Sequence, residues 1–229
     1  MRILALDTAL PAVSVCVFDA GQQQLLAIES TPMQRGHAEA LMPAIARVMA
    51  KIEGGFAALD RIAVTVGPGS FTGIRIGVAA ARGIALACGI EAVGVSTLAA
   101  FAAPLLFDDF DGIVVSAIDA RHDHVFFKAY GPGGRVLTSP RCLSLRDACR
   151  LLGAGRIRAV GSGAELLRAE ATRLSGEISV VNAAPSPDIV AVARLGLAAD
   201  PPNAPARPLY LKAPDVKLAV NKALPRALA

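Results

Sequence analysis

A glycine-rich stretch at residues 67–77, with the sequence GPGSFTGIRIG, is the strongest chemical signal in the chain. It lies between an apolar run typical of a buried strand and a segment with helical periodicity. A glycine-rich turn that enters a helix leaves backbone N–H groups free at the positive end of the helix dipole, which favours bound anions. The stretch is neither a P-loop, because no Gly-Lys-Ser/Thr follows at the required spacing, nor a hydrolase nucleophile turn, because Thr72 stands where G-x-S-x-G needs glycine. The structural alternative is a tight strand-to-helix connection with Thr72 as the N-cap.

Asp7 and Thr8 form a second pair of interest, a carboxylate and a hydroxyl at the end of the first apolar run. The carboxylate of Asp7 could orient a metal ion or a phosphate. It could equally cap the turn that follows the strand. The sequence leaves both interpretations open.

Histidines are few, and only His122 and His124 are close in sequence. Two imidazoles two residues apart could bind a metal, but a third ligand is not evident nearby. His37 opens a segment with helical periodicity, where a capping or surface role is the simpler interpretation. The four cysteines lack both C-x-x-C and zinc-finger spacing and are interpreted as buried thiols. We therefore expect no metal site and no intrinsic cofactor.

The elements that must position these residues are predicted in the order βββαβαβα, repeated once. In the first half, we expect strands at residues 2–8, 13–18, 23–29, 61–66 and 92–95, and helices at 37–52, 72–87 and 97–103. After an acidic break at 107–112, we expect strands at 113–119, 125–130, 135–138, 157–160 and 178–181, and helices at 143–152, 164–174 and 187–197. The repetition indicates a duplicated ribonuclease-H-like unit.

This order resembles the actin/sugar-kinase/Hsp70 (ASKHA) fold, an α/β fold of two ribonuclease-H-like lobes. We expect lobes at residues 1–106 and 107–200 and a Pro-rich tail at 201–229 that frays after Lys212. The resemblance implies a ligand cleft between the lobes, although Ala9 replaces the glycine of the Asp-x-Gly loop found in that fold. The candidate phosphate or nucleotide residues of this cleft are Asp7, Thr8, Gly67, Gly69, Ser70, Asp119, Arg121, Gly161 and Gly163.

The helix predicted at 72–87 has an unusual surface, because its only charges are Arg75 and Arg82, seven residues apart on one stripe. A helix that is apolar nearly all round needs a second neighbour. The helix predicted at 37–52 also has a face of small residues. Together they could form a close-packed bundle with another chain, and we favour this over packing against the second lobe or the tail.

Composition and charge limit the class of protein. Hydrophobic residues at 54% and a mean hydropathy of +0.51 exclude an intrinsically disordered chain. The longest uncharged run, residues 92–107, contains Pro104 and is shorter than the roughly 20 residues of a membrane span, and the N-terminus reaches Asp7 too early for a signal peptide. We expect a soluble, cytoplasmic protein without membrane contact.

The net charge of +4 is uneven, with −4 over residues 1–120 and +6 over residues 121–168. A basic second half could bind a polyanion. We favour a solvated, arginine-rich surface, because no basic run is interleaved with aromatic residues that would stack on bases.

Several motifs together resemble the bacterial TsaB family, also called YeaZ. These are DT at 7–8, GHAE at 36–39 with LMP at 41–43, GPGSFTGIRIG at 67–77, IDAR at 118–121 and PLYLK at 208–212. The match runs from residue 1 to about 212, and the glycine-rich string is highly specific.

The resemblance implies a non-catalytic paralogue that dimerises with TsaD and works with TsaE in making N6-threonylcarbamoyladenosine (t6A) beside the tRNA anticodon. It implies a homodimer when the chain is alone, indirect contact with tRNA, and ATP or ADP only at the level of the complex. The residues expected to contact a partner are His37, Glu39, Ala46, Ala50, Gly73, Arg75, Gly77, Ala80 and Arg82. We expect Gly77→Leu to block partner binding and leave the monomer largely folded.

The sequence also distinguishes this chain from TsaD-type catalytic relatives. In those proteins, two histidines four residues apart follow the strand after the glycine loop and bind a metal. By this alignment Thr97 and Phe101 occupy the two positions, so that metal's ligands are missing. One departure from the TsaB pattern is HDHVF at residues 122–126.

The rival hypothesis is an independent nucleotide-dependent transferase or hydrolase that uses the cleft between the lobes. The missing Asp-x-Gly glycine and the missing histidine pair argue against it. A peptidase is not supported, because no nucleophile–base pair is identifiable.

Overall fold

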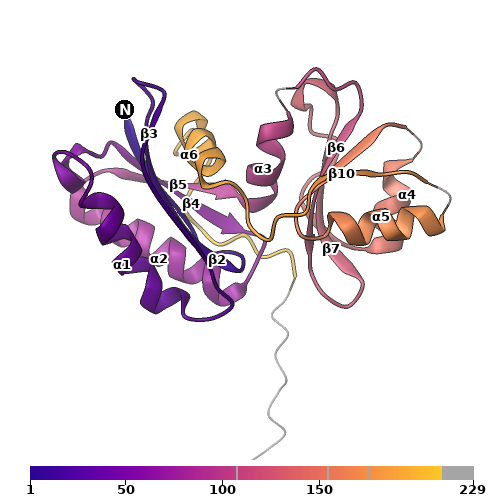
Figure 1. The fold of residues 1–229 in the computed structure, drawn as a ribbon, viewed down its shortest axis with the longest axis horizontal. Coiled ribbons are helices and arrows are strands. Elements are labelled where there is room, and N and C mark those ends of the chain that lie inside the picture. Colours follow the sequence, from indigo (N-terminus) through magenta and orange to yellow (C-terminus); the bar gives the residue numbers. More distant parts are fainter. Residues whose placement is uncertain (107, 154, 175, 213–229) are drawn as a thin grey trace, which may run out of the picture.

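The computed structural model describes residues 1–106, 108–153, 155–174 and 176–212, which form two lobes built on two five-stranded sheets (Figure 1). The strand order of the first sheet is β3-β2-β1-β4-β5. Its strands are β1 (Arg2–Asp7), β2 (Ala12–Asp19), β3 (Gln24–Pro32), β4 (Arg61–Gly67) and β5 (Glu91–Ser96). The first three strands pair antiparallel, and β4 and β5 continue the sheet in parallel with β1. This is the ribonuclease-H-like arrangement predicted from the sequence.

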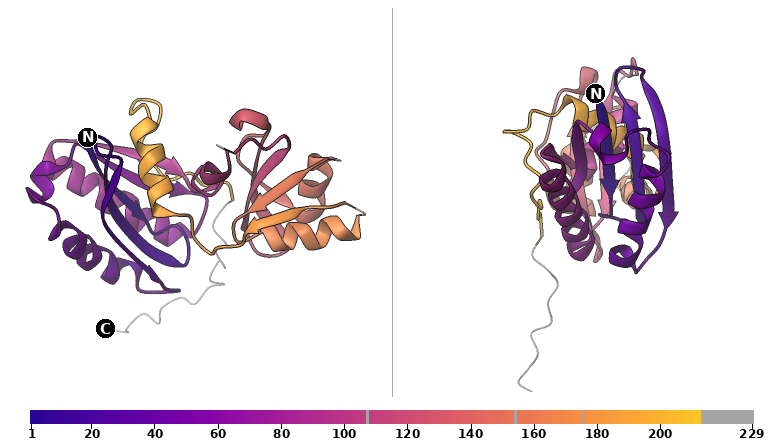
Figure 2. Two further views of the ribbon diagram at one scale, coloured as in Figure 1. Left: turned by 45° about the horizontal axis from the view of Figure 1, so that its top comes forward. Right: turned by 90° about the vertical axis from the view of Figure 1, so that its left-hand side faces the viewer.

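The helices of the described residues are α1 (His37–Met49), α2 (Phe71–Cys88), α3 (Thr97–Ala102), α4 (Leu145–Leu152), α5 (Ala164–Arg173) and α6 (Ile189–Ala198), with three short 3-10 turns at Gly55–Ala58, Ala103–Leu105 and Pro132–Gly134. Helices α1 and α2 cover one face of the first sheet, and α6 covers the opposite face (Figures 1 and 2). Helix α2 begins one residue before the predicted start, with Ser70 rather than Thr72 as its N-cap.

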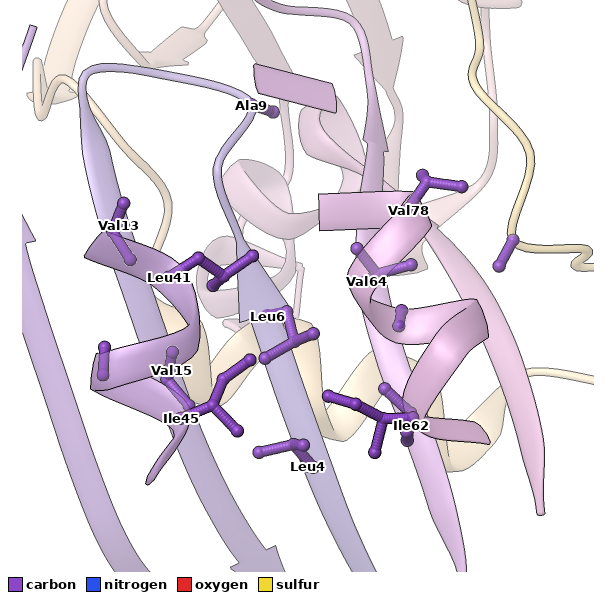
Figure 3. Packing of buried hydrophobic residues seen from close by; sticks show 14 of the residues in the cluster. Leu4, Leu6, Ala9, Val13, Val15, Leu41, Ile45, Ile62, Val64 and Val78 are labelled. Atoms are coloured by element: carbon purple, nitrogen blue, oxygen red, sulfur yellow. The ribbon is translucent and has the colours of Figure 1, made fainter. Parts of the chain in front are cut away.

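Strand β1 is buried on both sides because its side chains alternate between two cores. Leu4 and Leu6 point to the core under α1 and α2, where Figure 3 shows Leu6 beside Leu41. Ile3 and Ala5 belong to the core under α6. The central strand therefore reads as a continuous apolar run that ends at Asp7.

The second sheet has the strand order β10-β9-β6-β7-β8 and repeats the topology of the first. Its strands are β6 (Ile113–Asp119), β7 (His124–Tyr130), β8 (Arg141–Ser144), β9 (Ile157–Val160) and β10 (Ser179–Asn182).

The strand predicted at residues 135–138 is wrong, because β8 takes its place beside β7. The backbone N–H groups of Leu137 and Thr138 both donate to the carbonyl of Ala129, so this segment hooks over the end of β7. Only an isolated bridge joins Tyr130 to Val136. The chain pairs with β7 in a ladder only from Arg141, where β8 begins.

Helices α3 and α6 each cross between the lobes. Helix α3 follows β5 of the first sheet but packs against β6 and β7, and its Leu98 carbonyl accepts a hydrogen bond from Ser116 Oγ at 2.6 Å. Helix α6 follows the second sheet but packs on β1, β2 and β4. The sequence predicts this helix to belong to the lobe at residues 107–200, whereas α6 completes the core of the first lobe, where Gly196 lies directly on Ala63.

The tail also returns to the first lobe. Pro205 forms an antiparallel bridge with Val93, and the N–H of Leu209 donates to the carbonyl of Val66 at 2.7 Å. The expected fraying after Lys212 lies outside the described residues.

Helix α2 is, among the described residues, the one helix long and apolar enough to cross a membrane by length and composition alone. Its inner face packs on β4, yet only 33% of its 18 residues are buried. Its outer face is therefore an uncovered surface poor in charge.

Candidate interlobe site and the face of α1 and α2

A cavity of about 510 Å³ lies between the lobes. Its walls come from the loop after β1, the glycine-rich loop before α2, the turn between β6 and β7, and the tail. Of the predicted cleft residues, Gly69, Ser70, Asp119 and Arg121 line it. The sequence did not identify His37 and Lys212 as lining residues, and the structure adds both.

Asp7 does not line this cavity, because its side chain is completely buried. Its Oδ1 accepts hydrogen bonds from the N–H of Ala9 and the hydroxyl of Thr65, while Oδ2 has no partner among the described residues. Burial raises the pKa of Asp7, and the two hydrogen bonds oppose that effect. Of the two roles considered for Asp7, the structure shows the one that stabilises the turn.

Thr8 is also buried and ties the loop after β1 to helix α2. Its hydroxyl donates to the carbonyl of Gly73 at 2.7 Å. A Cβ on Gly69 would meet the carbonyl of Ala9, one on Gly73 would meet the carbonyl of Thr8, and one on Gly77 would lie 2.5 Å from Thr8 Oγ1. These glycines let the loop and α2 lie directly on the end of β1.

The expectation that Gly73 and Gly77 contact a partner is therefore corrected. Both are buried inside the first lobe, facing Thr8. A side chain at Gly77 would collide with Thr8, so Gly77→Leu would disturb the monomer itself and does not test partner binding.

The hydrogen bonds at the start of α2 use Ser70 as the helix cap. Ser70 Oγ accepts from the N–H of Gly73 at 3.2 Å, and the N–H of Ser70 donates to the carbonyl of Ala9. The ring of His37 has Nε2 at 3.1 Å from the carbonyl of Leu10. Within the described ranges no hydrogen bond joins Ser70 to His37.

The second-lobe wall is formed by a strained turn. Arg121, His122 and Asp123 have consecutive φ values of 64°, 53° and 56°, a left-handed conformation uncommon for residues other than glycine. Asp119 Oδ1 stabilises this turn by accepting from the N–H of Arg121 at 2.7 Å, while the N–H of Asp119 donates to Ser162 Oγ. The turn places Arg121 at the cavity.

Gly161 and Gly163 do not line the cavity; they allow the backbone to lie close to β6. A Cβ on Gly161 would meet the carbonyl of Ala117, and one on Gly163 would lie 3.1 Å from the N of Asp119. Gly67 has a φ of 109° at the end of β4 and is likewise a backbone position. These three residues bring the loops close to the strands without offering a side chain.

Metal-ligating side chains are dispersed in the part of the chain that the structure describes, where no three His, Cys, Asp or Glu residues gather. His124 Nδ1 lies 2.6 Å from the carbonyl of His122. Thr97 and Phe101, at the positions where the resemblance would place histidines in TsaD-type proteins, are both buried, and Phe101 belongs to a core that also includes Ile118 of β6.

The outer face of α1 and α2 is exposed and poor in charge. Of the predicted partner residues, Glu39, Ala46, Ala50 and Arg82 are exposed, and His37 and Ala80 are half-buried. Arg75 is exposed, but its guanidinium stacks 3.8 Å from the centre of the Phe71 ring and its Nε donates to Tyr210 Oη.

Two apolar side chains of this face were absent from the sequence-based set. Leu86 is 85% exposed and Met42 is 51% exposed. Gly83 lies on α2, as Leu86 does, and has open space where a Cβ would be. Leu86 was predictable, since it lies four residues from Arg82 and therefore on the same side of α2.

Comparison with known proteins assigns these features to a family. The family model "TsaD: tRNA N6-adenosine threonylcarbamoyltransferase" matches residues 24–139. The chain is 35% identical over 130 residues to the tRNA threonylcarbamoyladenosine biosynthesis protein TsaB of Escherichia coli, covering 57% of this chain and 55% of that protein. The chain thus spans about half the length of the TsaB proteins it matches.

Two longer matches cover nearly the whole chain. An uncharacterised protein of Mycobacterium tuberculosis is 32% identical over 216 residues, which is 94% of this chain and 93% of that protein. The solved structure of YeaZ from Pseudomonas aeruginosa has a TM-score of 0.71 and 27% identity, covering 92% of this chain and 99% of that chain. The fold of that structure therefore extends over both lobes described above.

Proposed function

The chain belongs to the TsaB (YeaZ) family, and from this membership we propose that it is a non-catalytic subunit of the complex that makes t6A in tRNA. The observation that carries the proposal is the outer face of α1 and α2. A soluble lobe seldom leaves a helix as apolar as α2 mostly uncovered. Leu86 of α2 and Met42 of α1 are the exposed large apolar side chains of this face.

The chemistry of this face suits another pair of helices. Ala46, Ala50 and Gly83 are small and exposed, so a partner's helices could approach closely, with Leu86 and Met42 as apolar anchors. We propose TsaD as the partner in a heterodimer and TsaE as a further subunit. The same face would pair two copies of the chain when it is alone.

The absence of a catalytic role is proposed from the identity of two residues. Thr97 and Phe101 stand where TsaD-type relatives would carry metal-binding histidines, and a phenyl ring cannot ligate a metal. Asp7 is buried under the turn it stabilises. Transfer of the threonylcarbamoyl group would then occur on the partner in the cytoplasm, with ATP or ADP and tRNA bound at the level of the complex.

The test introduces a charge into the exposed face. Leu86→Glu should abolish co-elution with TsaD on gel filtration and remove t6A synthesis by the reconstituted complex, because a buried, unpaired carboxylate opposes association. Leu151→Glu is the matched control, since Leu151 is 53% exposed on α4 of the other lobe. Unaltered binding of TsaD by the Leu86 variant would refute the proposed interface.

A second candidate is supported by the cavity between the lobes. Its volume of about 510 Å³ and the presence of Arg121 fit an independent nucleotide-dependent transferase or hydrolase. Binding or turnover of ATP by the purified chain without partners, lost in Arg121→Ala, would favour this candidate over the non-catalytic subunit.

A further inference from the structure

Residues 204–212 follow α6 and form no helix or strand of their own. The carbonyl of Ala204 accepts from the N–H of Gly94 at 2.8 Å, and Pro205 forms a bridge with Val93, on the open edge of β5. The N–H of Leu209 then donates to the carbonyl of Val66 at the end of β4. The segment is thus attached to the first sheet at two separate places.

Two glycines of the first sheet make room for this segment. A Cβ on Gly94 would lie 2.6 Å from the carbonyl oxygen of Pro205, and a Cβ on Gly67 would lie 2.8 Å from the carbonyl oxygen of Leu209. A side chain at either position would collide with the backbone of the segment. The sequence of the first sheet is therefore adapted to the tail, although more than 100 residues separate them.

Tyr210 fastens the segment to the start of α2. Its ring packs on Phe71 with centroids 4.8 Å apart and planes tilted by 32°. The guanidinium of Arg75 lies 3.8 Å from the centre of the Phe71 ring, and its Nε donates to Tyr210 Oη at 2.9 Å. An aromatic pair with an arginine over one ring is worth more than the area it buries.

The far end of the segment lies at the cavity between the lobes. Leu209 and Leu211 pack against a core formed mainly by residues of the first lobe, to which Ile118 of β6 also belongs. Lys212 lines the interlobe cavity together with Asp119 and Arg121 of the second lobe. Residues 209–212 therefore form the wall that closes the interlobe cavity on the side of the tail.

We propose that residues 204–212 act as a clasp that is fastened to the first lobe, closes the tail side of the cavity and sets how far that cavity opens. The group of Phe71, Arg75 and Tyr210 is the fastening of this clasp. Because that group also fixes the first turn of α2, release of the clasp frees the cavity and the start of the exposed helix together.

The proposal is tested by hydrogen exchange on the full chain. Tyr210→Ala should speed exchange of the Leu209 amide about tenfold, the order of effect expected when a buried hydrogen bond loses its support. Tyr210→Phe keeps the ring stacking and loses only the bond from Arg75, so its effect should be smaller. Arg82→Ala, two turns along α2 and away from the clasp, is the control and should leave the Leu209 amide unchanged.

The opening of the cavity needs its own readout. Small-angle scattering should give a larger radius of gyration for Tyr210→Ala than for the parent chain, with the circular dichroism spectrum preserved. Gly94→Ala should act in the same direction from the opposite end of the clasp. An unchanged Leu209 exchange rate, or faster exchange with no change in the radius of gyration of either variant, would overturn the proposal; if Tyr210→Ala unfolds, Tyr210→Phe decides it by the same two measurements.

Discussion

Gly69, Gly73 and Gly77 define the motif that identified the family, and each faces Thr8 or Ala9 across a gap too small for a Cβ. Their spacing of four residues places them on one side of the chain as it enters and follows α2. The specificity of this string therefore reflects close packing of a loop and a helix on the end of β1. Within the same string, Ser70 is the helix cap.

A pair of glycines on α2 gives the first prediction. Gly77→Ala should lower the free energy of unfolding by about 1–3 kcal/mol, because its Cβ would meet Thr8 Oγ1 and disturb the bond from Thr8 to Gly73. Gly83→Ala should raise it by up to about 1 kcal/mol, because alanine favours the helix and Gly83 has open space around it. Urea unfolding measures both, and changes of the same sign would contradict the packing described for α2.

Asp7 gives a prediction about pH. Its pKa is raised in the folded chain from the ordinary value of 3.8, so between these two pKa values the folded state binds more protons than the unfolded state. The contribution of Asp7 to stability is then fully present below pH 3.8 and is lost as the pH rises through the raised pKa.

The Asp7→Asn variant should lack this decline in unfolding free energy with rising pH, because it does not ionise and still offers an acceptor to Ala9 and Thr65. Urea unfolding at a series of pH values gives the two slopes. Asp109→Asn, at an exposed carboxylate, is the control. Equal slopes for Asp7→Asn and the parent chain would show that Asp7 does not titrate as described.

At the scale of elements, periodicity predicted most of the fold because the apolar residues of each strand and helix face a core. It failed at residues 135–138, where the alternation is the same as in a strand but Leu137 and Thr138 share one acceptor on Ala129. Periodicity also could not predict that the glycines of α2 contact Thr8 inside the first lobe, because it shows which residues share a face of a helix and not which neighbour that face contacts. The exposed position of Leu86, by contrast, was within reach of the sequence.

Helix α6 gives a prediction at this scale. Gly196 lies directly on Ala63 of β4, so a methyl group at either place excludes one at the other. Gly196→Ala should destabilise the chain by about 1–3 kcal/mol through overpacking. Adding Ala63→Gly to that variant should recover part of the loss, since it moves the methyl group across the interface. A double-mutant cycle measured by thermal unfolding tests this, and simple additivity of the two changes would count against the contact.

At the scale of the whole molecule, the lobes are joined by more than their linkers. Helix α3 packs on the second sheet, α6 packs on the first, and residues 204–209 return to β5 and β4. Sequence periodicity predicted the two copies of the unit but assigned α6 to its own half, because a helix carries the same apolar stripe whichever sheet it covers. The sequence therefore shows where one unit ends and the next begins, but a helix of each part, and the tail, pack on the other lobe.

This exchange predicts that the first lobe does not fold alone. A fragment of residues 1–106 would leave bare the face of the first sheet that holds Ile3, Phe18 and Ala63, because α6 is missing. We expect it to bind a hydrophobic dye and to lose a cooperative unfolding transition, since an uncovered apolar sheet face cannot offset the entropy of ordering the chain. Joining residues 1–96 to residues 186–200 through a flexible linker should restore cooperative unfolding, because that fusion returns α6 to its sheet. Cooperative unfolding of residues 1–106 without dye binding would mean that the lobes are independent and that α6 is not needed to complete the first core.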